Sequence, residues 1–528
     1  MDNILPFFSK PTMTGGSGQV DNFFYPSVSI ITVNYNGIRY LADLFNSISK
    51  LDYPKDRIQT IMVDNCSGDS SVDFVKNNYP FVEIISMAQN TGFAGGNNAG
   101  FRAATGEYMA LINNDCTANT GWLKTLARFA VEKNCVEKFG AAGSKVLFFY
   151  SYLIAEFSMP GNASVLISDI SINSDINSYY ADGDSLKTQS FFLSDTELLK
   201  GDMSKSIKFL KDCQPVGAGK NGKPRSHRIT DGAIIGFPII FSSSKTHIKL
   251  TVCPENVKVV AEDNPEIKID IIKYENSSQN QNPTGLIQPD NSLGEPAVID
   301  RKQVYSGLLR GESSIINIEI PKNDYDFRQC IINSCCLEVN RSFYARDRGA
   351  NTVDTGRFES AEEVFSPSGS SLLISKKCLE DTGFFETGFF TYYEDLDLFW
   401  RARLKGWRMY FVPGSIVSHH HCGTGAEWSK TFTYHVLRNR LLAIYRCGWP
   451  KLVLRSQAAS TAVLMLAIAG LIKSFLKGKK QHRPDIIVRL RIFFELFYLL
   501  PMHFFKRMKI RKTSSVNEHY IKKWMVDF

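Results

Sequence analysis

Residues 28–36 read VSIITVNYN, a short apolar run rich in β-branched side chains that ends in polar residues. Such a run is typical of a buried strand, and the polar residues that follow Val33, together with Gly37, are typical of a turn. We therefore expect a strand over 28–33 that ends beside Asn34 and Asn36.

The same pattern continues downstream of this strand. A helix pattern over 41–49 precedes an apolar run at 58–63, and a capped helix up to Lys76 precedes an apolar run at 82–86. A β-α-β-α-β alternation predicts a Rossmann-like α/β fold, with a mostly parallel sheet and helices on both faces. Ligands of such folds bind at the carboxyl ends of the strands, so polar residues at those ends are the first candidates for a site.

The length of 528 residues exceeds the usual size of one domain, so two or three domains are expected. A hydrophobic content of 44% with 22% charged residues is typical of a globular chain and argues against a disordered, collagenous or multi-span membrane protein. The eleven cysteines include no CxxC pair, which argues against a disulfide framework or a zinc module and favours reduced thiols in the cytosol.

Positive charge concentrates near the C-terminus. The stretch 473–512 is rich in lysine and arginine and has only Asp485 and Glu495 as acidic residues. Two apolar segments, 456–472 and 492–505, have basic flanks, and the first is just shorter than the roughly 20 residues of a membrane-spanning helix. This pattern favours attachment to the anionic cytoplasmic leaflet, in the interface or with one span, and a pair of core helices is the alternative.

The texture of the sequence changes between residues 150 and 340. Short alternating apolar runs there are separated by clusters of Asn, Pro, Gly and Ser, which predicts an antiparallel β domain with sandwich-like spacing. Helical periodicity returns near Lys376 and is strongest over 394–404. We divide the chain into an N-terminal extension (1–26), a first α/β half (27–150), a β-rich insertion (151–340), a second half (341–445) and a C-terminal helical region (446–528).

Asp64 ends the run at 58–63, where its carboxylate suits a hydrogen bond from the N–H of a pyrimidine base. Capping of the following helix is a common alternative for such an aspartate. The glycine-rich residues 92–96 would let the backbone approach a ligand closely, but they lack the spacing of a dinucleotide loop and the lysine of an ATP-binding loop.

A candidate metal site follows the apolar run at 108–112. Asn113, Asn114 and Asp115 offer oxygen ligands, which suit Mg²⁺ or Mn²⁺, although a simple Asx turn explains the same residues. His419, His420 and His421 follow another strand-like run, and the imidazole of one of them could complete the site, with a surface histidine cluster as the alternative.

Three carboxylates stand at the start of the helix predicted at 394–404, those of Glu394, Asp395 and Asp397. Like charges in proximity favour a raised pKa for one of them, and a general base for a hydroxyl is the functional interpretation. The alternative is a favourable interaction of acidic side chains with the helix dipole.

Taken in order, these segments resemble family 2 glycosyltransferases of the bacterial rhamnosyltransferase-like type. The resemblance is carried by SVSIITVNYN (27–36), VDNCS (63–67), NTGFAGGNNAG (90–100), GEYMALINND (106–115), GWL (121–123), SGSSLLI (368–374), FFTYYEDLDLFWRAR (389–403), GWR (406–408) and VSH (417–419). It covers residues 27–150 and 340–445, somewhat under half of the chain. The long insertion between them departs from the family pattern.

The resemblance implies a GT-A fold and an inverting transfer that uses Mg²⁺ or Mn²⁺. Asp395 matches the family's base, with Glu394 and Asp397 as supporting groups, while Asp115 and His419 match metal ligands. The nucleotide-sugar would be bound by residues of the first half: Asn34, Asn36, Asp64, Asn65, Gly92, Asn97, Asn113 and Asn114. Asn113 departs from the family's metal-binding DxD motif, in which this position is a carboxylate.

We therefore expect a hexosyltransferase, for rhamnose or another hexose, that moves the sugar from a UDP- or dTDP-linked donor to a lipid-linked or polysaccharide acceptor. The expected location is the cytoplasmic face of the inner (plasma) membrane, and nucleic acid is not an expected partner. A degenerate transferase that binds carbohydrate through its β insertion is the alternative, favoured by Asn113. A nucleotidyltransferase ranks last, because the turn after the first predicted strand offers Arg39 as its only basic residue.

Overall fold

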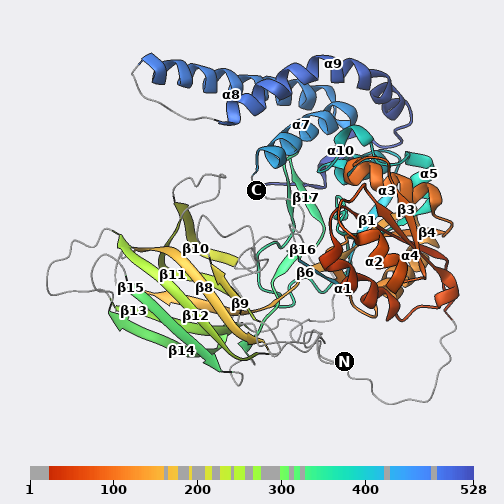
Figure 1. Cartoon of the computed structure of the whole chain (residues 1–528). Coiled ribbons are helices and arrows are strands. Elements are labelled where there is room, and N and C mark those ends of the chain that lie inside the picture. Colours follow the sequence, from red (N-terminus) through yellow and green to blue (C-terminus); the bar gives the residue numbers. More distant parts are fainter. Residues whose placement is uncertain are drawn as a thin grey trace. The chain divides into compact units, whose positions relative to one another are not determined.

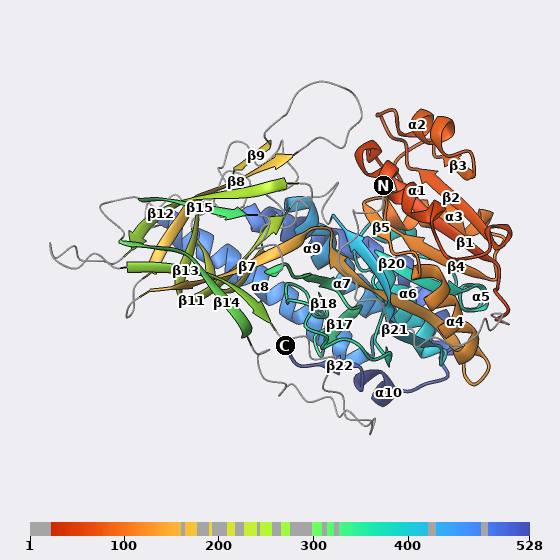
Figure 2. The same ribbon diagram turned by 90° about the horizontal axis from the view of Figure 1, so that it is seen from below.

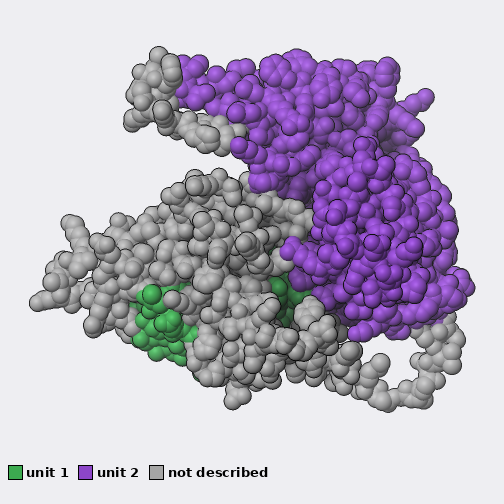
Figure 3. All heavy atoms as spheres, in the orientation of Figure 1, with its two compact units in different colours: residues 1–22, 148–333, 351–359 green, residues 23–147, 334–350, 360–528 purple. Residues whose placement is uncertain are grey.

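The computed structural model describes residues 23–159, 164–176, 189–192, 208–216, 226–239, 243–255, 266–274, 298–308, 314–321, 327–420, 429–476 and 484–528. The chain forms two compact units: unit 1 comprises 1–22, 148–333 and 351–359, and unit 2 comprises 23–147, 334–350 and 360–528 (Figure 3). The expected N-terminal extension lies, up to residue 22, outside the described residues.

A mixed sheet with the strand order β19-β21-β6-β20-β4-β1-β2-β3 forms the centre of unit 2, and β5 pairs with β21 (Figure 1). The strands are β1 (Val28–Asn34), β2 (Ile58–Asp64), β3 (Val82–Ser86), β4 (Tyr108–Ile112), β5 (Cys116–Ala118), β6 (Phe139–Phe148), β19 (Glu362–Glu363), β20 (Ser371–Ser375) and β21 (Arg408–His419). From β3 through β2 and β1 to β4 the strands run parallel. Beyond β4, the pairs of β20 with β4 and β6, and of β21 with β19 and β5, are antiparallel.

Helices cover both faces of this sheet, as the alternation of strands and helices predicts. They are α1 (Ile38–Ser49), α2 (Ser71–Asn78), α3 (Gly92–Ala103), α4 (Trp122–Asn134), α5 (Lys376–Thr382) and α6 (Glu394–Leu404), with one-turn helices at Lys55–Arg57 and Thr387–Phe389. One apolar core joins the sheet to α1 and α4 through residues such as Leu44 and Trp122. A second core joins it to α3 and α6 through residues such as Phe101 and Phe399.

The sequence pattern predicts a helix that follows the glycine-rich segment 92–98 and ends at Ala104. This prediction is wrong in its start, because the glycine-rich segment is itself helical. Helix α3 begins at Gly92, and its glycines bring it close to β1. A Cβ atom on Gly96 would lie 2.6 Å from Val33 Cγ1, and one on Gly100 would lie 2.4 Å from Ile31 Cγ2. Both contacts are shorter than packed carbon atoms allow, so the missing side chains permit close packing of helix on sheet.

Four helices and a small sheet complete unit 2 (Figures 1 and 2). They are α7 (Lys430–Cys447), α8 (Pro450–Leu476), α9 (Pro484–Lys512) and α10 (Glu518–Lys522), with the strands β17 (Leu337–Asn340), β18 (Ala345–Asp347) and β22 (Met525–Val526). Helix α7 packs against α6, α8 and α9. Within the described residues, the segment Pro450–Lys473 is long and apolar enough to cross a membrane, with a mean hydropathy of 1.6.

Unit 1 contains a nine-stranded sheet with the order β14-β13-β7-β11-β8-β12-β15, in which β10 also pairs with β11 and β9 with β8. Its strands are β7 (Ser151–Ser158), β8 (Ser164–Ile176), β9 (Gln189–Phe192), β10 (Lys208–Val216), β11 (Ser226–Ile239), β12 (Ser243–Glu255), β13 (Glu266–Tyr274), β14 (Val298–Leu308) and β15 (Ser314–Pro321), and β16 (Ile332–Ser334) follows in the chain. The neighbouring strands run antiparallel, as predicted. The described strands belong to one hydrogen-bonded sheet, whereas the spacing predicts the two sheets of a sandwich.

Candidate active site

Polar side chains meet at the carboxyl ends of the three parallel strands β1, β2 and β4. The Asn114 amide donates to Asn34 Oδ1 at 2.9 Å, and the Asn34 amide donates to Asp64 Oδ1 at 3.3 Å. The second oxygen of Asp64 accepts from the backbone N–H of Ser67 at 3.1 Å. Asn34 and Asp64 are paired in the register of the sheet and are buried. A continuous row of hydrogen bonds therefore fixes these predicted nucleotide-binding residues at one edge.

The turn after β1 is shaped around this row. Asn36 has a left-handed backbone (φ 51°), and its side chain accepts from the backbone N–H of Gly68 at 2.7 Å. Gly37 follows, and a Cβ atom there would lie 2.2 Å from the Asn114 amide nitrogen. The sequence NYNG thus closes β1 without displacing Asn114.

Two of the predicted donor-binding residues, Asn65 and Asn97, hold the backbone around the start of α3. The Asn65 amide donates to Gly92 O at 3.0 Å and its Oδ1 accepts from Thr91 N at 3.0 Å. The Asn97 amide donates to Phe93 O at 2.9 Å, within its own helix. Gly92 has a φ of +71°, and a Cβ there would lie 2.3 Å from Phe390 O. These three predicted residues, Asn65, Gly92 and Asn97, shape the start of α3 through contacts inside the protein.

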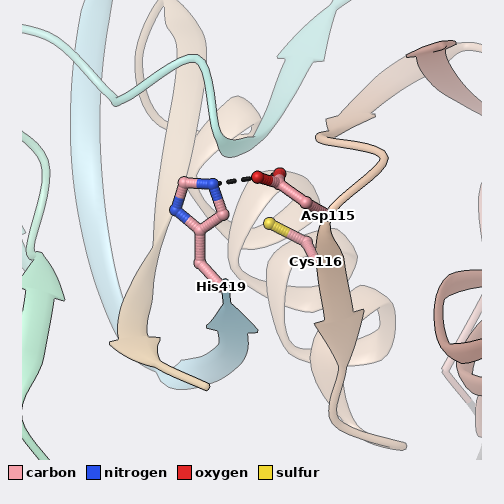
Figure 4. Close-up of side chains that lie close together, drawn as sticks. All are labelled: Asp115, Cys116 and His419. Carbon is pink, nitrogen blue, oxygen red and sulfur yellow. Dashed lines mark ion pairs between the residues drawn. The ribbon is translucent and has the colours of Figure 1, made fainter. Parts of the chain in front are cut away.

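Asp115, Cys116 and His419 form the one group of three metal-ligating side chains within the described residues (Figure 4). Strands β5 and β21 bring them together, because His419 is the antiparallel partner of Cys116. The His419 imidazole lies 3.1 Å from Asp115 Oδ1, and the backbone N–H of His420 donates to Asp115 O at 3.0 Å. The structure thus brings together Asp115 and His419, the two residues predicted as metal ligands.

The donor atoms of this group suit a divalent cation. A carboxylate oxygen, an imidazole nitrogen and a sulfur lie within 4.8 Å of one another, and all three residues are buried. Oxygen and nitrogen ligands are shared by Mg²⁺, Mn²⁺ and other first-row divalent ions. Cys116 escaped the sequence analysis because a single cysteine after a strand carries no metal-ligand spacing. Asn113 contributes a backbone N–H that donates to Ser370 O at 3.0 Å.

Asp395 lies at the start of α6 and is held by two backbone N–H groups. Gly369 N donates to its Oδ2 at 3.1 Å, and Leu396 N lies 2.7 Å from its Oδ1. Burial raises the pKa of Asp395 to about 6, against the lowering effect of these hydrogen bonds. Such a carboxylate is ionised at neutral pH and still basic enough to accept a proton from a hydroxyl group.

The neighbouring acids have different environments. Burial, reinforced by the charge of Asp395, raises the pKa of Glu394 well above its ordinary range. Glu394 Oε2 has no hydrogen-bond partner among the described residues, so no contact there offsets the cost of burying its charge. The raised pKa favours the neutral form, which adds no negative charge beside Asp395.

Asp397 is buried in an ion-pair cluster. Its Oδ1 accepts from Arg446 Nε at 2.6 Å, and its Oδ2 accepts from Arg401 Nε at 2.8 Å. Arg446 also donates to Glu386 Oε2 at 2.7 Å and lies 2.9 Å from His503 Nδ1. The two guanidinium groups, working against burial, lower the pKa of Asp397, which stays ionised. Asp397 on α6 therefore belongs to an ion-pair cluster with residues of α7 and α9. Asp395, in contrast, is held by backbone N–H groups.

Two segments match models of known families. Residues 29–152 match the model described as "Glycosyl transferase family 2", and residues 328–438 match "Glycosyltransferase like family 2". Together they include the strand-end row, the Asp115–His419 pair and Asp395. Both matched segments are therefore of family 2 glycosyltransferase type, and the β-rich insertion separates them. The expected mixed α/β fold, with the parallel strands β3, β2, β1 and β4 and an inserted antiparallel sheet, is confirmed.

Curated relatives are glycosyltransferases matched over part of their length. The poly(ribitol-phosphate) β-N-acetylglucosaminyltransferase TarS of Staphylococcus aureus strain Mu50 is 31% identical over 107 residues, 20% of this chain and 19% of that protein. The putative teichuronic acid biosynthesis glycosyltransferase TuaG of Bacillus subtilis is 28% identical over 117 residues, 22% of this chain and 46% of that protein. The chain thus spans about a fifth to just under half of these relatives.

Solved glycosyltransferase structures are also similar. S. aureus TarS 1–349 in complex with UDP-GlcNAc matches with 26% identity and a TM-score of 0.21, over 23% of this chain and 34% of that chain. The mannosyltransferase PcManGT from Pyrobaculum calidifontis, in complex with GDP-Man and Mn²⁺, matches with 11% identity and a TM-score of 0.36, over 93% and 88%.

Proposed function

We propose that this chain is an inverting, metal-dependent glycosyltransferase that moves a hexose from a UDP- or dTDP-linked donor to a lipid-linked or polysaccharide acceptor. The observation that carries the proposal is the combination of the buried Asp115–His419 pair with a carboxylate of raised pKa, Asp395, in one family 2 domain. The proposed class of acceptor is supported mainly by the relatives, since TarS is named for poly(ribitol-phosphate) and TuaG for teichuronic acid biosynthesis.

In the proposed reaction, Asp395 accepts the proton of the acceptor hydroxyl group. The hydroxyl oxygen then forms a bond to the anomeric carbon while the bond from that carbon to the nucleoside diphosphate breaks, so the configuration inverts. A cation held by Asp115 and His419 would supply positive charge opposite the diphosphate leaving group. Asp64 and the Asn34–Asn114 pair would hold the base and ribose at the strand ends.

The turn at 368–370 joins the two halves of this arrangement. Gly369 N donates to Asp395, and the carbonyl of Ser370 accepts from Asn113 N, two residues before Asp115. Proton acceptor and metal ligands are therefore connected through backbone hydrogen bonds of one short turn. This rigidity supports a role in positioning two substrates relative to each other.

The chain's location follows from the same proposal. A lipid-linked acceptor would be presented at the cytoplasmic face of the plasma membrane. Helices α8 and α9 carry exposed apolar residues and basic residues that would bind this face. The segment Pro450–Lys473 is long and apolar enough to span a membrane, and 22% of its apolar window is buried, whereas a core helix would be mostly buried. We therefore propose that this region attaches to the membrane, either peripherally or with one span.

The direct test is a donor panel followed by one substitution. Purified protein is mixed with UDP- and dTDP-sugars, with and without Mn²⁺, and the melting temperature is measured, because a ligand that binds the native state raises it. Asp395→Asn should abolish sugar transfer and keep the donor-dependent shift. Asp381→Asn is the matched control, because Asp381 is an exposed aspartate near the end of α5 that pairs with Lys405. Normal turnover by Asp395→Asn would show that another group is the base.

A second candidate function is a degenerate transferase that binds carbohydrate through unit 1. Asn113, where the family's DxD motif has a carboxylate, favours it. Hydrolysis of the best-binding donor in the presence of Mn²⁺ would exclude this candidate, and donor binding without hydrolysis or transfer to any offered glycan would support it.

A further inference from the structure

Helix α9 has two distinct faces. Its outer face carries large apolar side chains that are more than half exposed, at helical spacing of three to four residues. They are Ile487 (73% exposed), Phe494 (65%), Phe497 (66%), Tyr498 (56%), Met502 (66%), Phe505 (79%) and Met508 (55%). Exposed apolar side chains in such number on one helix indicate a surface that is covered by a partner.

Charge identifies the kind of partner. Between residues 486 and 512, Glu495 is the only acidic residue, whereas the basic residues are Arg489, Arg491, Lys506, Arg507, Lys509, Arg511 and Lys512. The Glu495 carboxylate pairs with Arg491 at 3.0 Å and also accepts from Tyr434 and Arg438, so it offsets one of these charges and the helix keeps a net positive charge. Apolar residues next to lysine and arginine complement the acyl chains and headgroups of an anionic bilayer.

The neighbouring helix α8 also carries exposed apolar side chains. It packs against α9, and its exposed apolar residues include Leu454 (71% exposed), Met465 (52%) and Leu466 (72%). A soluble partner protein would need a matching apolar groove with negatively charged residues around its rim. A lipid bilayer provides both properties without a specific shape, which suits a long and irregular apolar surface.

The inner face of α9 is buried against α7 through Ile492 and Leu496, which pack with Leu441. Two polar side chains of this face make specific contacts. Glu495 Oε2 accepts from Arg438 Nε at 3.1 Å and from the Tyr434 hydroxyl at 2.6 Å.

The second contact of the inner face is that of His503 Nδ1 with Arg446 Nη1, at 2.9 Å. Burial and the positive charge of Arg446 lower the pKa of His503 to about 4, so the neutral imidazole accepts from the guanidinium group. Lys506 also pairs with Glu386 at 2.8 Å.

Arg438 and Arg446 contact the loop before Asp395 and the residues that flank it. Arg438 donates to Gly388 O at 2.8 Å, and Arg446 binds Glu386 just before the loop and Asp397 just after it. Asn439, next to Arg438, donates through its amide to the carbonyls of Phe389, Thr391 and Tyr392 at 2.8 to 2.9 Å. This loop, residues 387–393, is therefore held from one side by α7, whose arginines are held in turn by α9.

The loop needs such support because its backbone is strained. Phe390, Tyr392 and Tyr393 have left-handed conformations, with φ of 66°, 65° and 70°. A non-glycine residue in this region is strained by contacts of its Cβ atom, and the strain persists only where surrounding contacts enforce it.

We propose that the outer face of α9 docks on an anionic lipid bilayer and that docking stabilises, through Glu495 and His503, the conformation of loop 387–393 that presents Asp395. The importance of this loop for catalysis rests on the proposed function. The docking and the stabilisation of the loop do not, because both can be measured without any substrate. Lipid contact would thus favour the active arrangement where a lipid-linked acceptor is present.

The test is hydrogen exchange of the full chain with vesicles of phosphatidylcholine alone or mixed with phosphatidylglycerol. Anionic vesicles should bind the protein and slow amide exchange in peptides covering 387–397 by roughly threefold or more. Glu495→Gln should still bind the vesicles and lose the slowing in the loop. Glu518→Gln is the matched control. Among the described contacts, the Glu518 carboxylate pairs with Lys522, which lies on the same helix, α10.

A double change of the outer face, Phe494→Ser with Phe505→Ser, should reduce vesicle binding at least tenfold. Phe81→Ser, which removes an aromatic side chain that is 45% exposed near α2, should not. Equal binding to neutral vesicles, unchanged binding of the double variant, or vesicle binding with no change of exchange in the loop would each overturn the proposal. Absence of sugar transfer alone would instead count against the proposed function.

Discussion

Sugar transfer should depend on pH through the ionisation of Asp395. Burial raises the pKa of this carboxyl group to about 6, and only its ionised form can accept a proton. At pH 7 about 90% of a group with this pKa is ionised, and at pH 5 about 9%. We therefore expect kcat/KM to fall about tenfold between pH 7 and pH 5.

The ordinary pKa of aspartate gives a different profile. A carboxyl group with a pKa of about 3.8 would still be more than 90% ionised at pH 5, so kcat/KM would hardly change over this interval. The direction of the pKa shift therefore decides the pH profile of kcat/KM. As the pH falls, a carboxyl group with a raised pKa loses its ionised, active form at a higher pH than an ordinary aspartate does.

The assay is nucleotide release at saturating Mn²⁺, with the donor that gives the largest thermal shift. The thermal shift itself, measured at pH 5 and pH 7, shows whether the donor still binds and whether the protein is still folded. A midpoint near pH 4, or a tenfold loss that the donor-binding signal follows in parallel, would refute the assignment of Asp395 as a base with a raised pKa.

Three further changes test the packing and the metal site. Asp397→Asn leaves the Arg401 and Arg446 guanidinium groups partly unpaired in a buried position, so urea unfolding should show a loss of about 3 to 5 kcal/mol, and a loss below 1 kcal/mol would contradict the ion-pair cluster. Gly96→Ala places a Cβ 2.6 Å from Val33 Cγ1 and should lower the free energy of unfolding by about 1 to 3 kcal/mol, measured in the same way, while an unchanged value would mean that α3 can move away from β1. Removal of divalent ions with EDTA should abolish transfer and reduce the donor-dependent thermal shift, both restored by Mn²⁺, and Asp115→Ala should make the shift insensitive to Mn²⁺. A Mn²⁺-dependent shift of full size in that variant would place the cation elsewhere.

The sequence predicts the parallel half of the central sheet closely, because each of its strands is a largely apolar run that ends in a polar residue or is followed by one. Val28–Asn34 and Ile58–Asp64 match the predicted strands to within one residue, and α6 begins and ends as the periodicity predicts. Asn34, Asp64 and Asn114 also meet as expected, since parallel strands bring their carboxyl ends to one edge.

Other features depend on contacts between distant residues, and no local pattern carries them. Asp397 pairs with Arg401 one helical turn away, which spacing indicates, but also with Arg446, which is 49 residues away. No local pattern distinguishes Asn439 from the other residues of its arginine-rich helix. Only the fold places its amide against three carbonyl groups. The early start of α3 likewise follows from tertiary packing, because glycines are poor helix formers by themselves.

The turn at Gly369 and Ser370 has a consequence for how such an enzyme can change its specificity. Its N–H and C=O groups, which every residue but proline provides, connect Asp395 to the loop before Asp115. Side-chain substitutions leave these main-chain links in place, so the enzyme can exchange the side chains that select a sugar or an acceptor while the two reacting centres keep their separation. An insertion or deletion of one residue in this turn would change that separation directly, even with every catalytic side chain intact.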